Sequence, residues 1–260
     1  MDARRTLFAY RRLYGLPALN VVEGLLTGNI NSLKLPSREG GLSVRLLRAL
    51  FGIEPSLAEY VYVFDYASKD LVNMGKMAAL ADTRIIEWGH KVSFAYVTPE
   101  GATPQALQGL ARHIVQTGQL LCGSCQGLLF DTEDREALYA LCETLLPLLE
   151  AEAAHWRDAI DLGARAPRRA GAALTPAIQL GHAWARRLPR AKLLETLRPY
   201  KNHLQTAGLL CAPADRAPLT DRLWRADVVR VTGDMSDGFC GEAHDGDYPL
   251  RRYTKVVSGW

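Results

Sequence analysis

The sequence lacks long apolar runs, a large excess of one charge and an even set of cysteines, and each absence excludes a class of protein. No stretch approaches the roughly 18 consecutive apolar residues that cross a bilayer, so we expect no membrane span. The 31 basic residues exceed the 28 acidic residues by too little to indicate a nucleic-acid partner. Five cysteines in 260 residues exclude a small disulfide scaffold and favour reduced thiols in the cytosol.

The start of the chain also lacks the pattern of a signal peptide. Arg4 and Arg5 precede an apolar stretch, but Arg11 and Arg12 interrupt it. The sequence shows no internal repeat. Its hydrophobic fraction of 48% and charged fraction of 23% are typical of globular proteins. We therefore expect a cytoplasmic protein of one large domain or two small ones.

Helix-like and strand-like segments alternate along the chain, which predicts an α/β fold with mainly parallel sheets. Ser43 and Thr103 are expected to open helices. The stretch 165–201 carries nine basic residues, one acid and four prolines, and predicts an irregular connection. Its bases either contact the phosphates of coenzyme A or a dinucleotide, or form a solvated face. Helices are predicted at 3–14, 18–27, 43–50, 68–81, 103–119, 134–162 (one or two) and 219–226, and strands at 30–35, 60–64, 84–88, 92–97, 127–130, 206–211 and 228–231.

The most distinctive local motif is the pair Cys122 and Cys125, separated by glycine and serine. A redox dithiol of this spacing normally opens a helix, but here a strand follows. A zinc site needs a second pair of ligands, and none lies at suitable spacing. A nucleophilic thiolate in a loop between a helix and a strand could attack a carbonyl or a thioester. Two small buried residues in a tight turn are the remaining interpretation.

Two charged residues lie on otherwise apolar strands. Glu87 ends the strand at 84–88, where it could activate a thiol or a water, or lie in solvent as a strand-end acid. Lys34 lies on the strand at 30–35, where its ammonium group must reach either an anion, such as a nucleotide phosphate, or the solvent at the strand edge. Both residues are therefore candidates for a functional site.

Five segments, in the order in which they occur along the chain, resemble those of the Lux-type fatty acyl-CoA reductases, a branch of the aldehyde dehydrogenase superfamily. The segment 118–126 (GQLLCGSCQ) resembles the catalytic cysteine segment of that family, and 86–91 (IEWGHK) resembles its Glu-x-Gly-x-Lys segment. The other matches are 15–17 (GLP) with 23–31 (EGLLTGNIN) and 34–36 (KLP), then 202–206 (NHLQT), and 241–246 (GEAHDG) with 248–253 (YPLRRY).

The resemblance implies an aldehyde dehydrogenase-like α/β fold, with a parallel nucleotide-domain sheet and a catalytic α/β domain. It implies reduction of a fatty acyl thioester to an aldehyde with NADPH, the acyl group arriving as acyl-CoA or from a partner acyl-protein synthetase. Cys122 would be the nucleophile that forms the acyl-enzyme, Glu87 the nearby carboxylate, and Lys34 a contact of the cofactor's adenosine ribose or 2′-phosphate. Further cofactor-binding residues would be Asn29, Ser37 and Glu242. No metal is implied, and a homo-oligomer is expected.

The same resemblance predicts a nucleotide-binding-type domain at 1–100, a catalytic-cysteine domain at 101–205 and a C-terminal segment at 206–260 that returns to the first domain. The chain is shorter than members of the family. It has no oxyanion-binding asparagine just before Gly15, and between Asp82 and Thr83 it lacks a turn and helix that line the dinucleotide site. The alternative function is therefore that of a cofactor-free pseudoenzyme or assembly subunit of the same fold.

Overall fold

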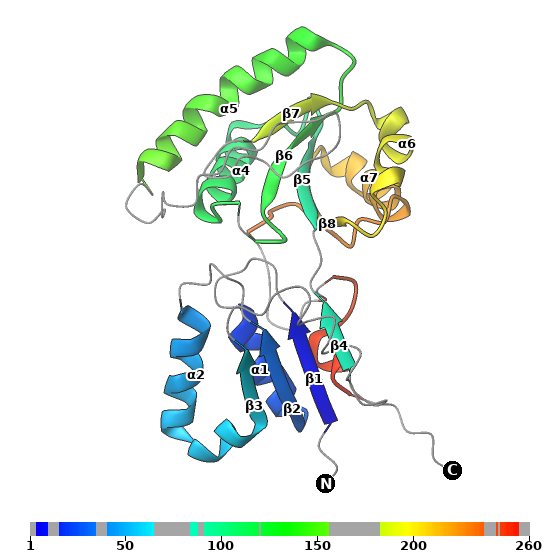
Figure 1. Cartoon of the computed structure of the whole chain (residues 1–260). Helices are drawn as coiled ribbons and strands as arrows, with labels where there is room; N and C mark the ends of the chain where they lie inside the picture. The colour runs from blue at the N-terminus through cyan, green and yellow to red at the C-terminus, as the bar shows by residue number, and fades with distance from the viewer. Residues whose placement is uncertain are drawn as a thin grey trace, which may run out of the picture. The chain divides into compact units, whose positions relative to one another are not determined.

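The computed structural model describes residues 4–9, 16–34, 41–64, 84–87, 91–119, 121–155, 183–236, 243 and 245–254. The chain forms two compact units (Figure 1). The first unit comprises residues 1–89 and 240–260, and the second comprises residues 90–239. The expected boundaries lay elsewhere. Residues 90–100 and 206–239 fall in the second unit because strands from both segments pair in its sheet.

The first unit contains a four-stranded parallel sheet of strand order β3-β2-β1-β4. Strand β1 is central and continues on one side into β2 and β3, whereas β4 lies on its other side. The elements are β1 (Arg4–Ala9), α1 (Leu16–Leu26), β2 (Asn29–Lys34), α2 (Leu42–Ile53), the 3₁₀ helix η1 (Pro55–Tyr60), β3 (Val61–Phe64), β4 (Arg84–Glu87) and α8 (Pro249–Arg252).

The helix predicted at 3–14 is wrong, because residues 4–9 form strand β1. Its basic and apolar residues fit a helical pattern locally, but the segment pairs with a parallel strand on each side. Backbone hydrogen bonds on both edges outweigh a weak local helix preference. The helix predicted at 68–81 lies outside the described residues.

The core of the first unit joins segments that are far apart in the sequence. Ala18 and Val21 of α1 pack with Leu33 of β2, and Tyr253 from the C-terminal part of the chain completes the cluster. The Tyr253 hydroxyl lies 3.0 Å from Asn20 Oδ1 and 2.9 Å from a Glu23 carboxylate oxygen. The buried ring of Tyr253 thus anchors the C-terminal segment to the first unit.

The second unit contains a five-stranded parallel sheet of order β7-β6-β5-β8-β9. Helices α4 and α5 cover one face and α6 and α7 the other (Figure 1). The elements are β5 (Val92–Val97), α4 (Pro104–Gln116), β6 (Cys125–Phe130), α5 (Arg135–His155), β7 (Trp184–Arg187), η3 (Arg190–Lys192), α6 (Leu193–Leu197), η4 (Arg198–Tyr200), β8 (Leu204–Leu210), α7 (Pro213–Arg225) and β9 (Arg230–Thr232).

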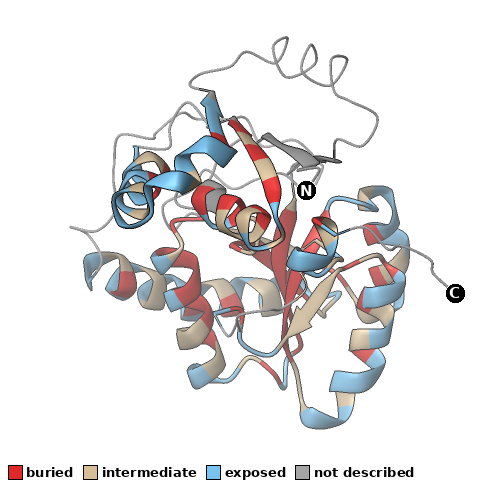
Figure 2. Ribbon diagram, turned by 90° about the horizontal axis from the view of Figure 1, so that it is seen from below, coloured by how far each residue is buried: buried red, intermediate tan, exposed pale blue. Residues whose placement is uncertain are grey.

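Alternation of side chains along β5 explains how one sheet supports two cores. Phe94 and Tyr96 face the cluster that includes α6 and α7, and Ala95 and Val97 face the cluster that includes α4 and α5. Strands β5, β6 and β8 are buried at every position, as expected of a parallel sheet covered on both faces (Figure 2).

Local signals in the sequence predicted some helix starts and missed others. Thr103 caps α4 as expected, because its hydroxyl accepts a hydrogen bond from the Ala106 N–H. Ser43 does not cap α2. Gly41 takes that place with a φ of 74°, and Ser43 is buried in the first turn. Helix α7 begins six residues earlier than predicted, at Pro213. Proline suits the first helical position because the N–H that it lacks would have no partner in the helix there.

The connection predicted as irregular at 165–201 contains strand β7 and the turns of α6. Strand β7 carries two arginines in four residues and lies at the edge of the sheet, so its pattern is weak. Trp184 packs over Gly127 of β6, where a Cβ would overlap the Trp184 backbone carbonyl and its ring. Contacts of this kind, rather than local pattern, define the edge strand.

Candidate functional site

Cys122 lies at the corner of a tight turn that follows α4 and leads into β6. The Ser124 N–H donates to the Leu121 carbonyl at 3.0 Å, and the Leu121 N–H donates to the Ser124 hydroxyl at 3.0 Å. The reciprocal bonds between these two residues fix the turn, and Cys122 is partly exposed between them. Gly118 and Gln119 precede the turn with left-handed φ values of 53° and 58°. The turn therefore leaves Cys122 partly exposed, whereas Ser124 and Cys125 after it are buried.

Buried hydroxyls and amides support the turn from the sheet. The Ser93 hydroxyl donates to the Cys122 carbonyl at 2.6 Å and accepts from the Thr206 N–H at 3.0 Å. The Gln205 Oε1 accepts from the Thr206 hydroxyl at 3.0 Å. Ser93 and Thr206 are at most 1% exposed. They lie at the amino ends of adjacent strands β5 and β8, so the cysteine turn rests on the amino edge of this sheet.

Amide side chains hold the turn where it enters β6. The Gln119 Nε2 donates to the Cys125 carbonyl at 3.1 Å, and the Gln126 Nε2 donates to the Gln119 carbonyl at 3.1 Å. The Cys125 N–H in turn donates to the His113 Nε2 at 3.3 Å. The sequence interpretation missed His113 and Ser93. Their only signal was a polar residue inside an otherwise apolar run, and each bonds to a segment remote in sequence.

The two cysteines of the motif have different environments. Cys125 is the first residue of β6, is fully buried, and its thiol lies 3.2 Å from the Gly127 carbonyl. Burial raises the pKa of the Cys125 thiol to about 12, so this residue stays protonated at neutral pH. Because Cys125 begins a strand, the motif does not open a helix as redox dithiols do. Within the described part of the chain, no three metal-binding side chains cluster.

In the first unit, the strand register aligns two of the predicted site residues. Ala9 at the end of β1 pairs with Lys34 of β2 on one side and with Glu87 of β4 on the other. All three residues end their strands at the carboxyl edge. Because β2 and β4 extend from opposite sides of β1, the chain reverses its strand order between β1 and β4. Ligands of open α/β sheets bind in the crevice at this point.

Asn29 lies at the opposite edge, at the start of β2. It is 4% exposed. Its side-chain Nδ2 donates to the Thr27 hydroxyl at 2.8 Å and to the Tyr253 carbonyl at 3.2 Å. These bonds tie the turn before β2 to the C-terminal segment, and Asn29 and Lys34 end up at opposite edges of the sheet. A role of Asn29 in cofactor binding stays a prediction, and Ser37 and Glu242 lie outside the described residues.

The model of the family "Acyl-CoA reductase (LuxC)" matches residues 63–161 and 184–256. The match contains Glu87 and Cys122, whereas Asn29, Lys34 and Ser37 precede it. No curated protein matches the chain. In the described residues, no helix has both the length and the apolar character needed to traverse a bilayer.

Solved aldehyde dehydrogenases have the same fold. Delta-pyrroline-5-carboxylate dehydrogenase from Mycobacterium tuberculosis, bound with NAD and cobalamin, superposes with a TM-score of 0.62 at 12% identity, over 98% of this chain and 63% of the other. Glyceraldehyde-3-phosphate dehydrogenase GapN from Methanocaldococcus jannaschii, complexed with NADP, gives 0.62 at 10% identity, over 96% and 70%. Propionaldehyde dehydrogenase from Rhodopseudomonas palustris, with bound propionyl-CoA, gives 0.60 at 11% identity, over 89% and 64%.

This chain spans 63% of the first of these structures, so the likeness establishes the fold rather than the activity of a whole enzyme. The predicted α/β class with parallel sheets is confirmed. The family model covers more than half of the residues, including the cysteine turn and the strand that ends in Glu87. The chain therefore belongs to the LuxC acyl-CoA reductase family, on the fold of the aldehyde dehydrogenases.

Proposed function

We propose that the protein reduces a fatty acyl thioester to an aldehyde through an acyl-enzyme on Cys122. The observation that carries the proposal is the contrast within one motif: Cys122 is presented on a bonded turn, whereas Cys125 is buried and protonated. A partly exposed thiol on a rigid support suits a nucleophile. One related structure, the propionaldehyde dehydrogenase from Rhodopseudomonas palustris, was solved with CoA and an acylated cysteine.

The first step is an acyl transfer. The Cys122 thiolate attacks the carbonyl carbon of the acyl thioester, the bond from that carbon to the donor sulfur breaks, and the donor leaves as a thiol after taking up a proton. The Ser93 hydroxyl and the Ser124 turn hold the backbone of Cys122 during this exchange. A hydride added to the new thioester, followed by cleavage of its bond to Cys122, releases the aldehyde and restores the thiolate.

The hydride requires a nicotinamide cofactor, and we propose NADPH. The four-stranded sheet fits such a ligand, because its order β3-β2-β1-β4 matches the first half of a dinucleotide-binding sheet. Lys34 and Glu87, on either side of Ala9 at the carboxyl edge, are the residues proposed to hold or face the cofactor. Bound there, NADPH supplies the hydride. We further propose acyl-CoA or an acyl-protein synthetase as the acyl donor and a homo-oligomeric assembly.

Acylation and reduction can be tested separately. The protein is incubated with radiolabelled acyl-CoA, and the label is located by peptide mass spectrometry. Label is expected on Cys122, absent from Cys122→Ala and retained by the matched variant Cys125→Ala. NADPH is then expected to release the label as aldehyde. Label that stays on Cys122 after NADPH is added indicates a cofactor-free acyl carrier. Label that never reaches Cys122 refutes the acyl-enzyme.

A further inference from the structure

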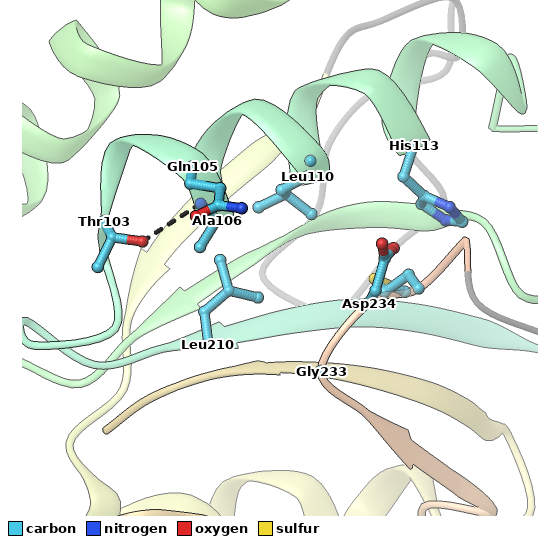
Figure 3. A pocket seen from close by; sticks show the side chains of 10 residues that line it. Thr103, Gln105, Ala106, Leu110, His113, Leu210, Gly233 and Asp234 are labelled. Carbon is cyan, nitrogen blue, oxygen red and sulfur yellow. Dashed lines mark hydrogen bonds between the residues drawn. The ribbon is translucent and has the colours of Figure 1, made fainter. Parts of the chain in front are cut away.

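A pocket of about 280 Å³ lies in the second unit, between α4 and the segment that follows β9 (Figure 3). Its wall includes Thr103 and His113 from the two ends of α4, Leu210 from β8, and Asp234. Figure 3 shows the His113 imidazole and the Asp234 carboxylate at the same end of the pocket. Of these residues, His113 also contacts the motif that carries Cys122.

The hydrogen bonds of His113 define its charge state. Nε2 accepts the N–H of Cys125 at 3.3 Å, so this nitrogen carries no proton. In the tautomer that accepts this bond, Nδ1 carries the proton of the neutral ring and lies 3.1 Å from the Ser236 hydroxyl. The ring thus bridges the segment after β9 and the first residue of β6. Protonation of Nε2 would remove the acceptor of the Cys125 N–H.

We propose that His113 is a positioning residue for Cys122, whose neutral ring anchors the end of the cysteine turn and whose protonated ring releases it. The inference rests on the nucleophilic role of Cys122 in the proposed function. On protonation, the ring loses the bond from the Cys125 N–H and gains a second N–H, and a hydrogen bond to the Gly123 carbonyl favours this protonated form. Gly123 follows Cys122 directly, so the exchange of partners acts on the backbone that presents the thiol.

The groups around His113 place the protonation of its ring on the acid side of neutrality. Burial is the main influence and lowers the pKa of His113. The Gly123 carbonyl and Asp234 raise this pKa, and Arg230 of β9 lowers it. On β6 the adjacent thiol of Cys125 is neutral at these pH values. His113 is therefore neutral at pH 7 and takes up its proton below its ordinary pKa of 6.5.

The test measures the reaction of Cys122 with a disulfide reagent, dithiodipyridine, from pH 4.5 to 8, with mass spectrometry to identify the labelled cysteine. For a simple thiol the logarithm of the rate rises with unit slope as pH rises. The wild type is expected to show an additional inflection below pH 6.5. His113→Gln keeps an acceptor and does not titrate, so its profile should be straight and within about twofold of the wild type at pH 7.5. His113→Leu removes the acceptor and should change the rate at pH 7.5 by more than about threefold.

Gln105→Ala, which alters the same pocket away from the cysteine turn, is the matched control and should follow the wild-type profile. Superimposable profiles of the wild type and His113→Gln would overturn the proposal, even if His113→Leu does not fold. Equal rates at pH 7.5 in folded His113→Leu and wild type would also overturn it. Because the assay uses no acyl donor, failure of Cys122 to take up an acyl group would refute the reductase and leave this result intact.

Discussion

Cys122 and Cys125 are three residues apart, and the turn between them gives the two residues different exposure to solvent. Ser124 bonds to Leu121 in both directions and leaves Cys122 at the corner. The next residue enters a strand whose six positions are all buried. The difference in exposure thus comes from backbone geometry rather than from the type of residue beside either thiol.

The burial of Cys125 predicts a pH dependence of stability. The folded thiol keeps its proton up to about pH 12, whereas the ordinary pKa is 9.0. Its contribution to stability is complete below pH 9 and falls between pH 9 and 12, by about 1.4 kcal/mol for each pH unit. Urea unfolding at pH 8 and pH 10 should therefore show a smaller loss of unfolding free energy in Cys125→Ala than in the wild type. Equal losses would contradict the burial of this thiol.

At the site, the sequence motif led to the proposed nucleophile but not to the residues that hold its turn. Cys122 could be predicted because its neighbours in sequence carry the family pattern. Ser93, Gln205 and His113 could not, because each is a single polar residue whose partner comes from a distant segment. Such partners become visible only when strands β5, β6 and β8 are adjacent.

At the scale of elements, the α4 helix and the loop before it offer two glycines with opposite roles. Gly101 lies against the end of β8, where a Cβ would overlap the carbonyl of Leu210. Gly109 lies inside α4, and a Cβ added there would meet open space. Gly101→Ala should lower the unfolding free energy by about 1–3 kcal/mol. Gly109→Ala should raise it by about 0.5–1 kcal/mol, because alanine favours the helix.

Chemical denaturation of both variants checks this pair. The two substitutions add the same methyl group, so a difference in sign isolates the effect of position. A stable Gly101→Ala protein would mean that the loop does not pack against β8 as described.

Two ion pairs join the segment after β6 to the turn at η3, and they should contribute unequally. Asp131, with 8% side-chain exposure, accepts from the Arg190 Nε at 2.6 Å and from its backbone N–H at 2.7 Å. The pair of Glu133 and Lys192 is exposed. Asp131→Ala should cost about 2–4 kcal/mol, because it leaves the Nε and the backbone N–H of Arg190 without their acceptor.

Glu133→Ala is the control for that measurement and should cost at most about 0.5 kcal/mol, because solvent screens the exposed pair. Thermal or urea unfolding of the two variants, under one buffer condition, gives the comparison. A cost for Asp131→Ala as small as that for Glu133→Ala would show that Asp131 does not hold η3.

The sequence predicted best the elements that have a clear apolar pattern, with or without a capping residue at the end. Helix α4 combines an apolar face with a threonine cap, and β5 is a continuous apolar run. Strand β1 failed on both counts, because its identity depends on β2 and β4 as neighbours. Strand β7 failed because an edge strand needs few apolar residues.

At the scale of the whole molecule, the second unit is continuous in sequence and the first is not. The second unit holds two apolar clusters of its own, one on each face of the five-stranded sheet. A fragment of residues 90–239 should therefore fold by itself and unfold in one cooperative transition, measured by circular dichroism. A fragment of residues 1–89 lacks Tyr253 and should show no such transition. The reverse result would contradict the division at 89 and 240.

The same division has a consequence for synthesis on the ribosome. Helix α1 and strand β2 leave the ribosome early, but the ring of Tyr253 that packs with them follows only after all of residues 90–239. All residues of the second unit are therefore synthesised before Tyr253 is added to the core of the first unit. A stop codon shortly before Tyr253 would therefore remove a core residue from the unit whose other elements were made before residues 90–239.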